Sequence, residues 1–462
     1  MIAQTTALVT GPLAARAERA VEEVAARLTR PERVESVTRR AETRIEAAYG
    51  IPVWHPLSLG AGLPGPALLY GELARSDQTY RPVAHRHISR AVQALPKPAG
   101  TGLFNGPAAL LAAAQTCAGS FDDYKSLRAA LAQWLATVQL RRLKAARRPD
   151  SRAVKEPGEY DLITGLSGTT RLLLDSAADA AENAADVRMA MTGSLEYLVG
   201  LARPIEVHGR QVPGWWLPAE SLLTEQERGH YPDGFFDTGM AHGIAGVMAV
   251  LCSALAYGYE VPGQLSAINC MAEWLSHWAK PRSPKAGWPD RVALLEQITD
   301  ELRPRSAVQT GWCYGTPGVA AALYRAGALL NRPPWCEQAV AVLRVDLARA
   351  QTQWGLDGPT ICHGYAGFLQ TTARVASHSA DADLIEGCRR ITAAVLAEAD
   401  AETPFLFPHV VRSNSVDMPP ERADRAGLLE GAAGVACVLL DVTRGPQSDP
   451  VGRSWDRCFG LA

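Results

Sequence analysis

The stretch Gln309–Tyr324, QTGWCYGTPGVAAALY, holds the pattern that decides the fold of this chain. A cysteine between two large aromatic residues, Trp312 and Tyr314, stands just before the sequence Gly315-Thr-Pro-Gly318. The residues after the second glycine are nearly all small or apolar, which is typical of a buried helix that begins at this point. A purely structural cysteine would fit better inside that apolar run. Its place at the start of the helix therefore raises the question of a functional sulfur.

The same arrangement, Gly-x-x-Gly followed by an apolar helix, occurs seven times, with Ala109 in place of the second glycine in the second copy. The copies begin 44 to 78 residues apart, which is room for two helices and their loops. A glycine inside a helix costs about 1 kcal/mol relative to alanine. We expect close packing of the helix starts to compensate, because a missing Cβ lets backbones approach. The first glycines of the copies are Gly62, Gly106, Gly165, Gly243, Gly315, Gly364 and Gly431.

Amphipathic patterns between the copies, such as those at residues 267–280, 335–354 and 388–400, indicate helices with one buried face. Strand-like alternation is scarce. Each repeat therefore reads as an outer amphipathic helix followed by an inner apolar helix. We predict an all-α fold, an α/α toroid of seven helical hairpins and about fourteen helices, with an open solenoid as the alternative. The glycine-rich helix starts favour the closed ring, which would bring them to one centre.

The toroid is expected to span residues 59–445, after N-terminal helices in residues 1–58 and before a C-terminal tail of residues 446–462. The longest gap between copies contains residues 202–238, which are rich in proline, glycine and aromatic side chains. We expect a structured loop over the centre of the ring. Two interpretations stay open: a lid or peptide-binding surface, and a simple cover for apolar helix ends.

Composition excludes several classes of partner. The chain is 47% hydrophobic and 20% charged with a net charge of −2, so neither nucleic acid nor an anionic membrane surface is expected as the main partner. No apolar run is long enough to span a membrane, and the first residues lack the pattern of a signal peptide. The nine cysteines are scattered, so we expect a cytoplasmic protein with reduced thiols. A special cysteine there is a metal ligand or a nucleophile rather than half of a disulfide.

The two positions before the first glycine carry the candidate site residues in the fourth, fifth and sixth copies. These residues are His242, Cys313 with Tyr314, and Cys362 with His363. Equivalent positions of neighbouring repeats in a ring point to the same region. Zinc prefers thiolate and imidazole ligands, and three protein ligands with an open fourth position mark a catalytic site. We predict that Cys313, Cys362 and His363 bind zinc. The remaining cysteines are interpreted as core or surface thiols: Cys117, Cys252, Cys270, Cys336, Cys388, Cys437 and Cys458.

His242 has no cysteine beside it, and its role stays open between a fourth ligand and an acid/base that faces the open metal position. Asp161 lies four residues before Gly165. Its carboxylate could orient a histidine, hold a substrate or cap the helix that follows.

Four motifs carry a resemblance to a known family: GWCYGTPG, CHGYAG, AHGIAG and YDLITGLSG. Over residues 55–445 or so the sequence resembles the lanthionine synthetase C-like family, the cyclases of lanthipeptide biosynthesis. The resemblance implies a seven-fold α/α toroid and zinc on the two motif cysteines and His363. One departure concerns an arginine that the family often carries four residues before the first zinc cysteine. This sequence has Gln309 there, and the nearest arginine is Arg305.

The resemblance also implies a reaction. A cysteine thiol of a dehydrated precursor peptide adds to dehydroalanine or dehydrobutyrine and closes a thioether ring. Zinc would hold the thiol as a thiolate, and His242 would protonate the enolate with the support of Asp161 or Tyr314. A dehydratase and an exporter are the implied partners.

Two alternatives remain at this level. The first is a protein that binds or transfers glutathione at the same zinc. The second is a metal-poor scaffold that binds peptides without catalysis.

Overall fold

The computed structural model divides into two compact units. Unit 1 comprises Met1–Leu131 and Gly355–Arg457, and unit 2 comprises Ala132–Trp354 and Cys458–Ala462. The described residues are 7–40, 45–46, 51–52, 54–95, 100–120, 122–146, 154–179, 185–279, 287–303, 310–411, 421–445 and 454–462.

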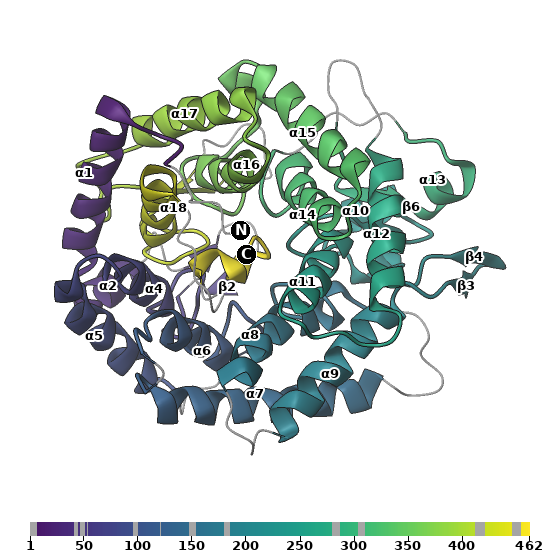
Figure 1. The fold of residues 1–462 in the computed structure, drawn as a ribbon, viewed down its shortest axis with the longest axis horizontal. Coiled ribbons are helices and arrows are strands. Elements are labelled where there is room, and N and C mark those ends of the chain that lie inside the picture. Colours follow the sequence, from purple (N-terminus) through teal and green to yellow (C-terminus); the bar gives the residue numbers. More distant parts are fainter. Residues whose placement is uncertain are drawn as a thin grey trace. The chain divides into compact units, whose positions relative to one another are not determined.

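Unit 1 contains inner helices that begin at the glycine motifs and outer helices that pack against them (Figure 1). The inner helices are α4 (Pro64–Leu73), α6 (Pro107–Thr116), α16 (Tyr365–Ser379) and α18 (Ala432–Arg444). The outer helices are α1 (Gly11–Leu28), α2 (Pro31–Thr38), α5 (Arg81–Val92) and α17 (Ala382–Ala397). Short antiparallel pairs join β1 (Ile45–Glu46) to β2 (Ile51–Pro52) and β7 (His409–Val411) to β8 (Glu421–Ala423). The 3-10 helix η1 is Gln78–Tyr80.

Unit 2 repeats this plan. Its inner helices, α8 (Leu166–Asp179), α11 (Ile244–Ala256) and α14 (Thr316–Leu329), pack side by side (Figure 1). The outer helices are α9 (Ala185–Gly200), α12 (Gln264–Trp278), α15 (Pro333–Ala348) and α7 (Lys125–Ala146), most of which belongs to this unit. The shorter elements are β3 (Ile205–Val207), β4 (Arg210–Val212), α10 (Glu225–His230), β5 (Phe235–Asp237), β6 (Arg291–Ala293), α13 (Leu294–Thr299), η2 (Pro157–Glu159), η3 (Ala219–Ser221), η4 (Gln351–Gln353) and η5 (Trp455–Phe459), which extends from unit 1.

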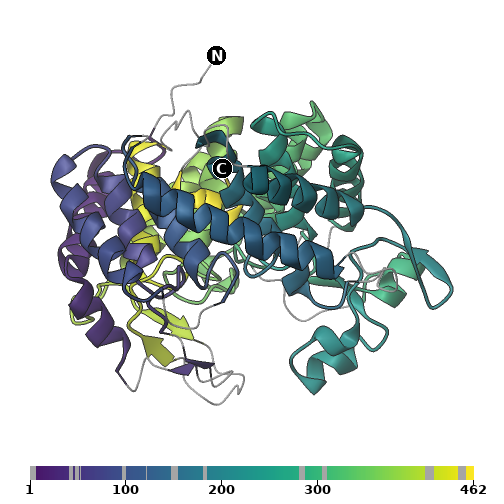
Figure 2. The ribbon, with the colours of Figure 1, turned by 90° about the horizontal axis from the view of Figure 1, so that it is seen from below.

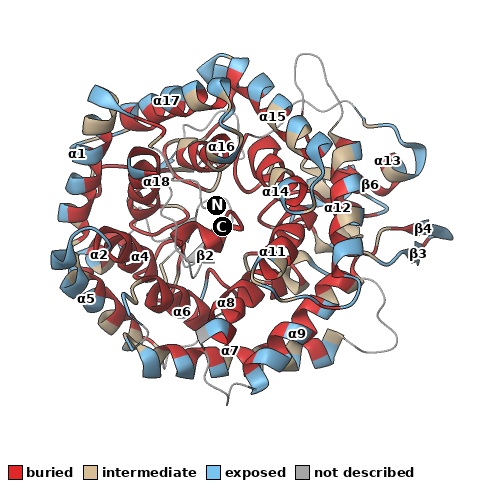
Figure 3. Cartoon of the chain, in the orientation of Figure 1, coloured by how far each residue is buried: buried red, intermediate tan, exposed pale blue. Residues whose placement is uncertain are grey.

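Burial separates the two kinds of helix (Figure 3). Every residue of α6 is buried, whereas α17 buries one face and exposes the other. This agrees with the predicted apolar inner and amphipathic outer helices. The outer helix expected over residues 335–354 ends earlier, at Ala348. The backbone becomes extended at Arg349, and the indole N–H of Trp354 donates back to the carbonyl of Asp346 over 2.9 Å, a bond that a continued helix could not form.

The motif glycines are required by close backbone packing. A Cβ on Gly243 would collide with the backbone N of Gly239, and one on Gly246 would collide with the carbonyl oxygen of Met240. At these two glycines the backbone that leads into the inner helix curls directly over the first turn of that helix. The expected crowding between repeats occurs at Gly65, where a Cβ would collide with the backbone of the loop in the seventh repeat.

Backbone hydrogen bonds link the loops of successive repeats. In unit 2, Leu162 N–H donates to the carbonyl of Ala241 over 3.0 Å, and Met240 N–H donates to that of Cys313 over 3.0 Å. Unit 1 has the equivalent bonds Cys362 N–H to Leu429 O, Leu428 N–H to Leu59 O, and Leu59 N–H to Phe104 O. These donors and acceptors lie two or three residues before the first glycines. The bonds therefore hold the candidate positions of neighbouring repeats close together within each unit.

Candidate metal and catalytic site

Asp161 and His242 come together from the loops before α8 and α11. Nδ1 of His242 lies 2.5 Å from Oδ2 of the buried Asp161 carboxylate. The other carboxylate oxygen accepts hydrogen bonds from the N–H groups of Thr164 at 2.7 Å and Gly165 at 2.6 Å. One side chain therefore fixes the loop before α8 and orients a histidine, whereas the helix cap that the sequence also allowed is not formed, because Thr164 and Gly165 precede the helix.

The electrostatic surroundings of His242 favour its protonated form. Burial alone would lower the pKa of His242, but the hydrogen bond and charge of Asp161 outweigh it and raise that pKa above its usual value. Asp237 and Cys313 act in the same direction. The side chain is still 36% exposed, so a substrate can reach it. With Nδ1 bonded to the carboxylate, Nε2 is the nitrogen available for proton transfer.

Tyr314 lies beside this pair and has a carboxylate of its own. Its O–H donates to Oδ2 of Asp237 over 3.1 Å, and its ring centroid lies 6.0 Å from that of His242. Asp237 is buried and also accepts the N–H of Gly239 at 2.9 Å. Arg291 reaches the same carboxylate, with Nε 3.7 Å from Oδ2.

Asp237 and Arg291 lie outside the residues that the sequence motifs predict for the site. Neither residue sits at the positions just before the first glycine that singled out the other candidates. They face each other across the β5–β6 ladder, whose strands lie far apart in the sequence. Strands this short give no alternation from which the pairing could have been read.

Cys362 and His363 occupy the loop that leads into α16. The N–H of Cys362 donates to Leu429, and the carbonyl of His363 accepts the N–H of Asp357 at 2.9 Å. The His363 ring lies 5.7 Å from the ring of buried His409, whose Nδ1 is 2.9 Å from Oγ1 of Thr360. Burial, Arg425 and His363 hold the pKa of His409 well below its usual range, so His409 is neutral.

Cys313 occupies the corresponding loop before α14. Its carbonyl accepts the N–H groups of Met240 and Ala241 at 3.0 and 3.2 Å. The preceding residue, Trp312, is buried and donates its indole N–H to the carbonyl of Phe459 over 3.0 Å. Both sides of the loop are therefore tethered, and the thiol is largely buried.

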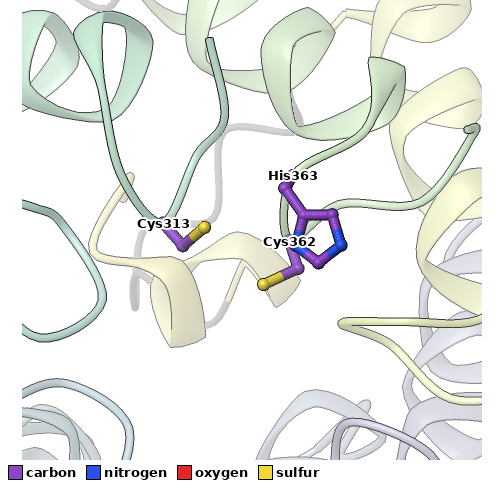
Figure 4. A group of neighbouring side chains, drawn as sticks. All are labelled: Cys313, Cys362 and His363. Carbon is purple, nitrogen blue, oxygen red and sulfur yellow. The ribbon is translucent and has the colours of Figure 1, made fainter. Parts of the chain in front are cut away.

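Among the described residues, the donors that could hold a metal ion are Cys313 of unit 2 and Cys362 with His363 of unit 1 (Figure 4). Zinc forms bonds of about 2.0–2.3 Å with sulfur and nitrogen donors. Two thiolates and one imidazole are donor types that suit zinc. Gln309 and Arg305, at and near the position where the family often has an arginine, lie outside the described residues.

Most aromatic residues of the segment 202–238 belong to the core of unit 2. Trp215 and Phe236 are buried against Trp274 of α12, with ring centroids 5.4 and 6.0 Å apart, and Phe235 is buried as well. Trp216 and Tyr231 remain partly exposed. Figure 2 shows α10 and the β3–β4 hairpin of this segment on one side of unit 2. The aromatic content therefore has a packing explanation for all but two side chains.

Over residues 53–459 the chain matches the family model described as lanthionine synthetase C-like protein, and it belongs to this family. The match extends into residues 446–462, which the repeats alone had not included. None of the helices in the described part of the chain is both long and apolar enough to cross a membrane.

Two relatives are more specific. The nisin biosynthesis protein NisC of Lactococcus lactis subsp. lactis is 25% identical over 324 residues, which cover 68% of this chain and 72% of that protein. The solved structure of a nisin cyclase superposes with a TM-score of 0.72 at 22% identity, covering 96% of this chain and 97% of that one. The likeness in structure confirms the predicted fold, an α/α toroid with few and short strands.

Proposed function

We propose that this chain is a zinc-dependent cyclase that closes thioether rings in a dehydrated peptide. The observation that carries the proposal is the set of two thiols and one imidazole, Cys313, Cys362 and His363, in a member of the lanthionine synthetase C-like family. The reaction adds a cysteine thiol of the peptide to the β-carbon of dehydroalanine or dehydrobutyrine. The product has the same mass as the substrate, because the thiol proton ends on the α-carbon.

The three ligands would hold the zinc and leave a position for the substrate. Zinc, when bound, keeps the substrate cysteine as a thiolate at a pH where the free thiol, with a pKa of about 8.5, is mostly protonated. The two protein thiolates keep the donor set rich in negative charge, which favours a nucleophilic substrate sulfur. Each of these two sulfurs lies at the start of an inner helix, where the helix dipole favours negative charge.

His242 is the proposed proton donor. As the carbon–sulfur bond forms, the electron pair of the carbon–carbon double bond moves onto the α-carbon and its carbonyl. The α-carbon must then receive a proton, and Nε2 of His242 can give it while Nδ1 keeps its bond to Asp161. Tyr314, fixed by Asp237, forms a polar neighbour beside the imidazole ring.

The chemistry of the substrate limits the cell compartments in which the reaction can occur. A peptide with a free thiol and dehydrated residues requires a reducing compartment, and we propose the cytoplasm. A dehydratase must supply the peptide, and an exporter would remove the product. We further propose that the segment 202–238 contacts the peptide through the partly exposed Trp216 and Tyr231. Deleting residues 208–230 should weaken peptide binding with zinc retained, and unchanged affinity with an intact fold would make the segment a cover.

The test uses the purified, zinc-loaded chain and a short synthetic peptide with one dehydroalanine and one cysteine. Alkylation with N-ethylmaleimide followed by mass spectrometry counts the remaining thiol. We expect the peptide to keep its mass and lose its reactive thiol only when the enzyme is present. Addition of glutathione to the dehydroalanine in preference to ring closure would instead assign the glutathione-transferring function. A chain that binds neither zinc nor thiol would be a scaffold.

A further inference from the structure

Arg291 lies outside the glycine motifs, and its side chain is more buried than is usual for an arginine. It is the first residue of β6 and pairs across the ladder with Asp237 of β5. Its side chain is only 20% exposed. Burying a guanidinium is costly unless charged and polar partners replace the lost water. The groups around it therefore indicate what the arginine is for.

The partners of Arg291 lie at two places in the segment 202–238, in α10 and in β5. On one side, Nη1 lies 3.0 Å from Oε1 of Glu227, which is part of the capping box of α10 in the segment 202–238. On the other side, Nε lies 3.7 Å from Oδ2 of Asp237, the oxygen that accepts the Tyr314 hydrogen bond. The guanidinium also lies over the Tyr314 ring, 5.7 Å from its centroid. Arg291 thus joins α10 to the tyrosine beside His242.

We propose that Arg291 is a positioning residue for the cyclisation, acting on Tyr314 through Asp237 and holding α10 through Glu227. This inference rests on the proposed function. An ionised Asp237 can only accept, so the Tyr314 O–H must point at it and the ring stays beside His242. The positive charge of Arg291 favours that ionised form.

The charge balance around Asp237 supports this role. Burial raises the pKa of Asp237 above its usual value, and Arg291 and His242 offset part of that rise. Without the arginine, the buried carboxyl would tend to take up a proton and become a hydrogen-bond donor. A protonated Asp237 no longer dictates which way the Tyr314 hydroxyl points.

Unit 2 provides a matched control of the same chemistry. Arg171 is fully buried, lies 2.7 Å from Oδ1 of Asp175, and donates to the hydroxyl of Tyr257 over 2.8 Å. Its guanidinium lies 4.9 Å from the centroid of the Tyr257 ring. Tyr257 follows the last residue of α11, whereas His242 precedes the first, so this group stands at the other end of the helix. Loss of Arg171 should cost stability and leave the reaction unchanged.

The first experiment measures zinc content, kcat and KM for the single variants Arg291→Met, Arg291→Lys, Tyr314→Phe and Arg171→Met, and for the double variant of Arg291→Met with Tyr314→Phe. We expect Arg291→Met to keep zinc and lower kcat by about 10-fold or more, the usual range for a group that orients a site residue. Arg291→Lys should recover part of the loss, because it keeps the charge without the planar fork. In the Tyr314→Phe background, Arg291→Met should lower kcat no further. Arg171→Met should lower only the melting temperature.

Two results would overturn the role in positioning Tyr314. One is an Arg291→Met variant with the kcat of the wild type. The other is a double variant whose fold-decrease in kcat equals the product of the decreases in the two single variants. A second experiment needs no substrate: hydrogen exchange of residues 225–237, which should be faster in Arg291→Met than in Arg171→Met. Equal exchange would contradict the tether to α10. A wild-type chain that closes no ring would refute the proposed function alone, since the exchange measurement still decides the tether.

Discussion

His242 and His363 occupy the same position, directly before the first glycine of their repeats, yet their surroundings differ. His242 is bonded to a buried carboxylate, which raises its affinity for a proton. His363 follows a cysteine and packs near the neutral ring of His409. A metal-binding imidazole must be unprotonated, whereas a proton donor must hold its proton near neutral pH. The repeat therefore sets where a histidine lies, and its neighbours decide what chemistry it suits.

The largest loss of activity should come from removing Cys362 or His363, the proposed zinc ligands. Cys362→Ala and His363→Ala are each expected to lose zinc and to slow cyclisation by about 1000-fold or more, because several kcal/mol of transition-state stabilisation disappear. The helical circular dichroism should persist, since the packed helices do not depend on the ion. Metal analysis by mass spectrometry checks the prediction, and Cys388→Ala, at a buried thiol of α17, is the control that keeps zinc. Full zinc occupancy in the ligand variants would refute the assignment.

The next effect concerns His242 itself. His242→Asn is expected to keep zinc and slow the reaction by about 100-fold or more, the range for loss of a general acid. The pKa of His242 is raised, so the protonated donor is present at low pH and is lost as the pH rises through that pKa, above about 6.5. The wild-type rate should therefore show a decline on the alkaline side that the variant lacks. Loss of zinc in this variant would instead make His242 a fourth ligand.

A smaller effect is expected when the carboxylate that distinguishes His242 is made neutral. In Asp161→Asn the amide oxygen can still accept the N–H groups of Thr164 and Gly165, so the loop before α8 keeps its conformation. The charge that raises the pKa of His242 is gone, so the alkaline decline should move to lower pH and the rate at neutral pH should fall by about 10-fold. Asp161→Ala should in addition lose about 1 kcal/mol of stability, because the hydrogen bonds to the loop N–H groups disappear. A decline that stays at the same pH in Asp161→Asn would show that the carboxylate does not govern His242.

The smallest effect should follow from changing the neighbour of His363. His409→Asn removes a neutral ring that packs near His363 and leaves the proposed ligands in place. We expect zinc to remain bound at saturating concentration and its affinity to fall by about 10-fold, as for other groups that support a ligand. Competition with a chromogenic chelator measures this change. An unchanged affinity would mean that His409 contributes only to packing.

The sequence predicted the repeat and the candidate site better than it predicted local boundaries and cross-strand partners. The Gly-x-x-Gly frame was informative because backbone crowding at positions such as Gly246 admits no side chain. The helix predicted to end at residue 354 ends at Ala348, and the indole of Trp354 bonds back to Asp346. Helical periodicity contains no information on such a side-chain hydrogen bond.

The same limit applied to side chains whose partners are distant in sequence. Arg291 was missed because its partners come from another strand and from α10. The aromatic residues of the segment 202–238 suggested a binding surface, although Trp215 and Phe236 pack against Trp274 of α12. Composition shows that aromatic residues are present, but only the tertiary structure shows which face they cover.

Zinc-dependent cyclisation with separate roles for the two histidines can be tested by measuring zinc content and ring closure on the same purified preparations of the wild type, His242→Asn and His363→Ala. We expect one zinc per chain and rapid loss of peptide thiol for the wild type, one zinc with slow loss for His242→Asn, and neither zinc nor ring closure for His363→Ala. Equal zinc content and equal rates in the two variants would contradict the division of labour between the two histidines. A wild-type chain that holds no zinc, or that closes rings equally well after chelation, would contradict zinc-dependent cyclisation altogether.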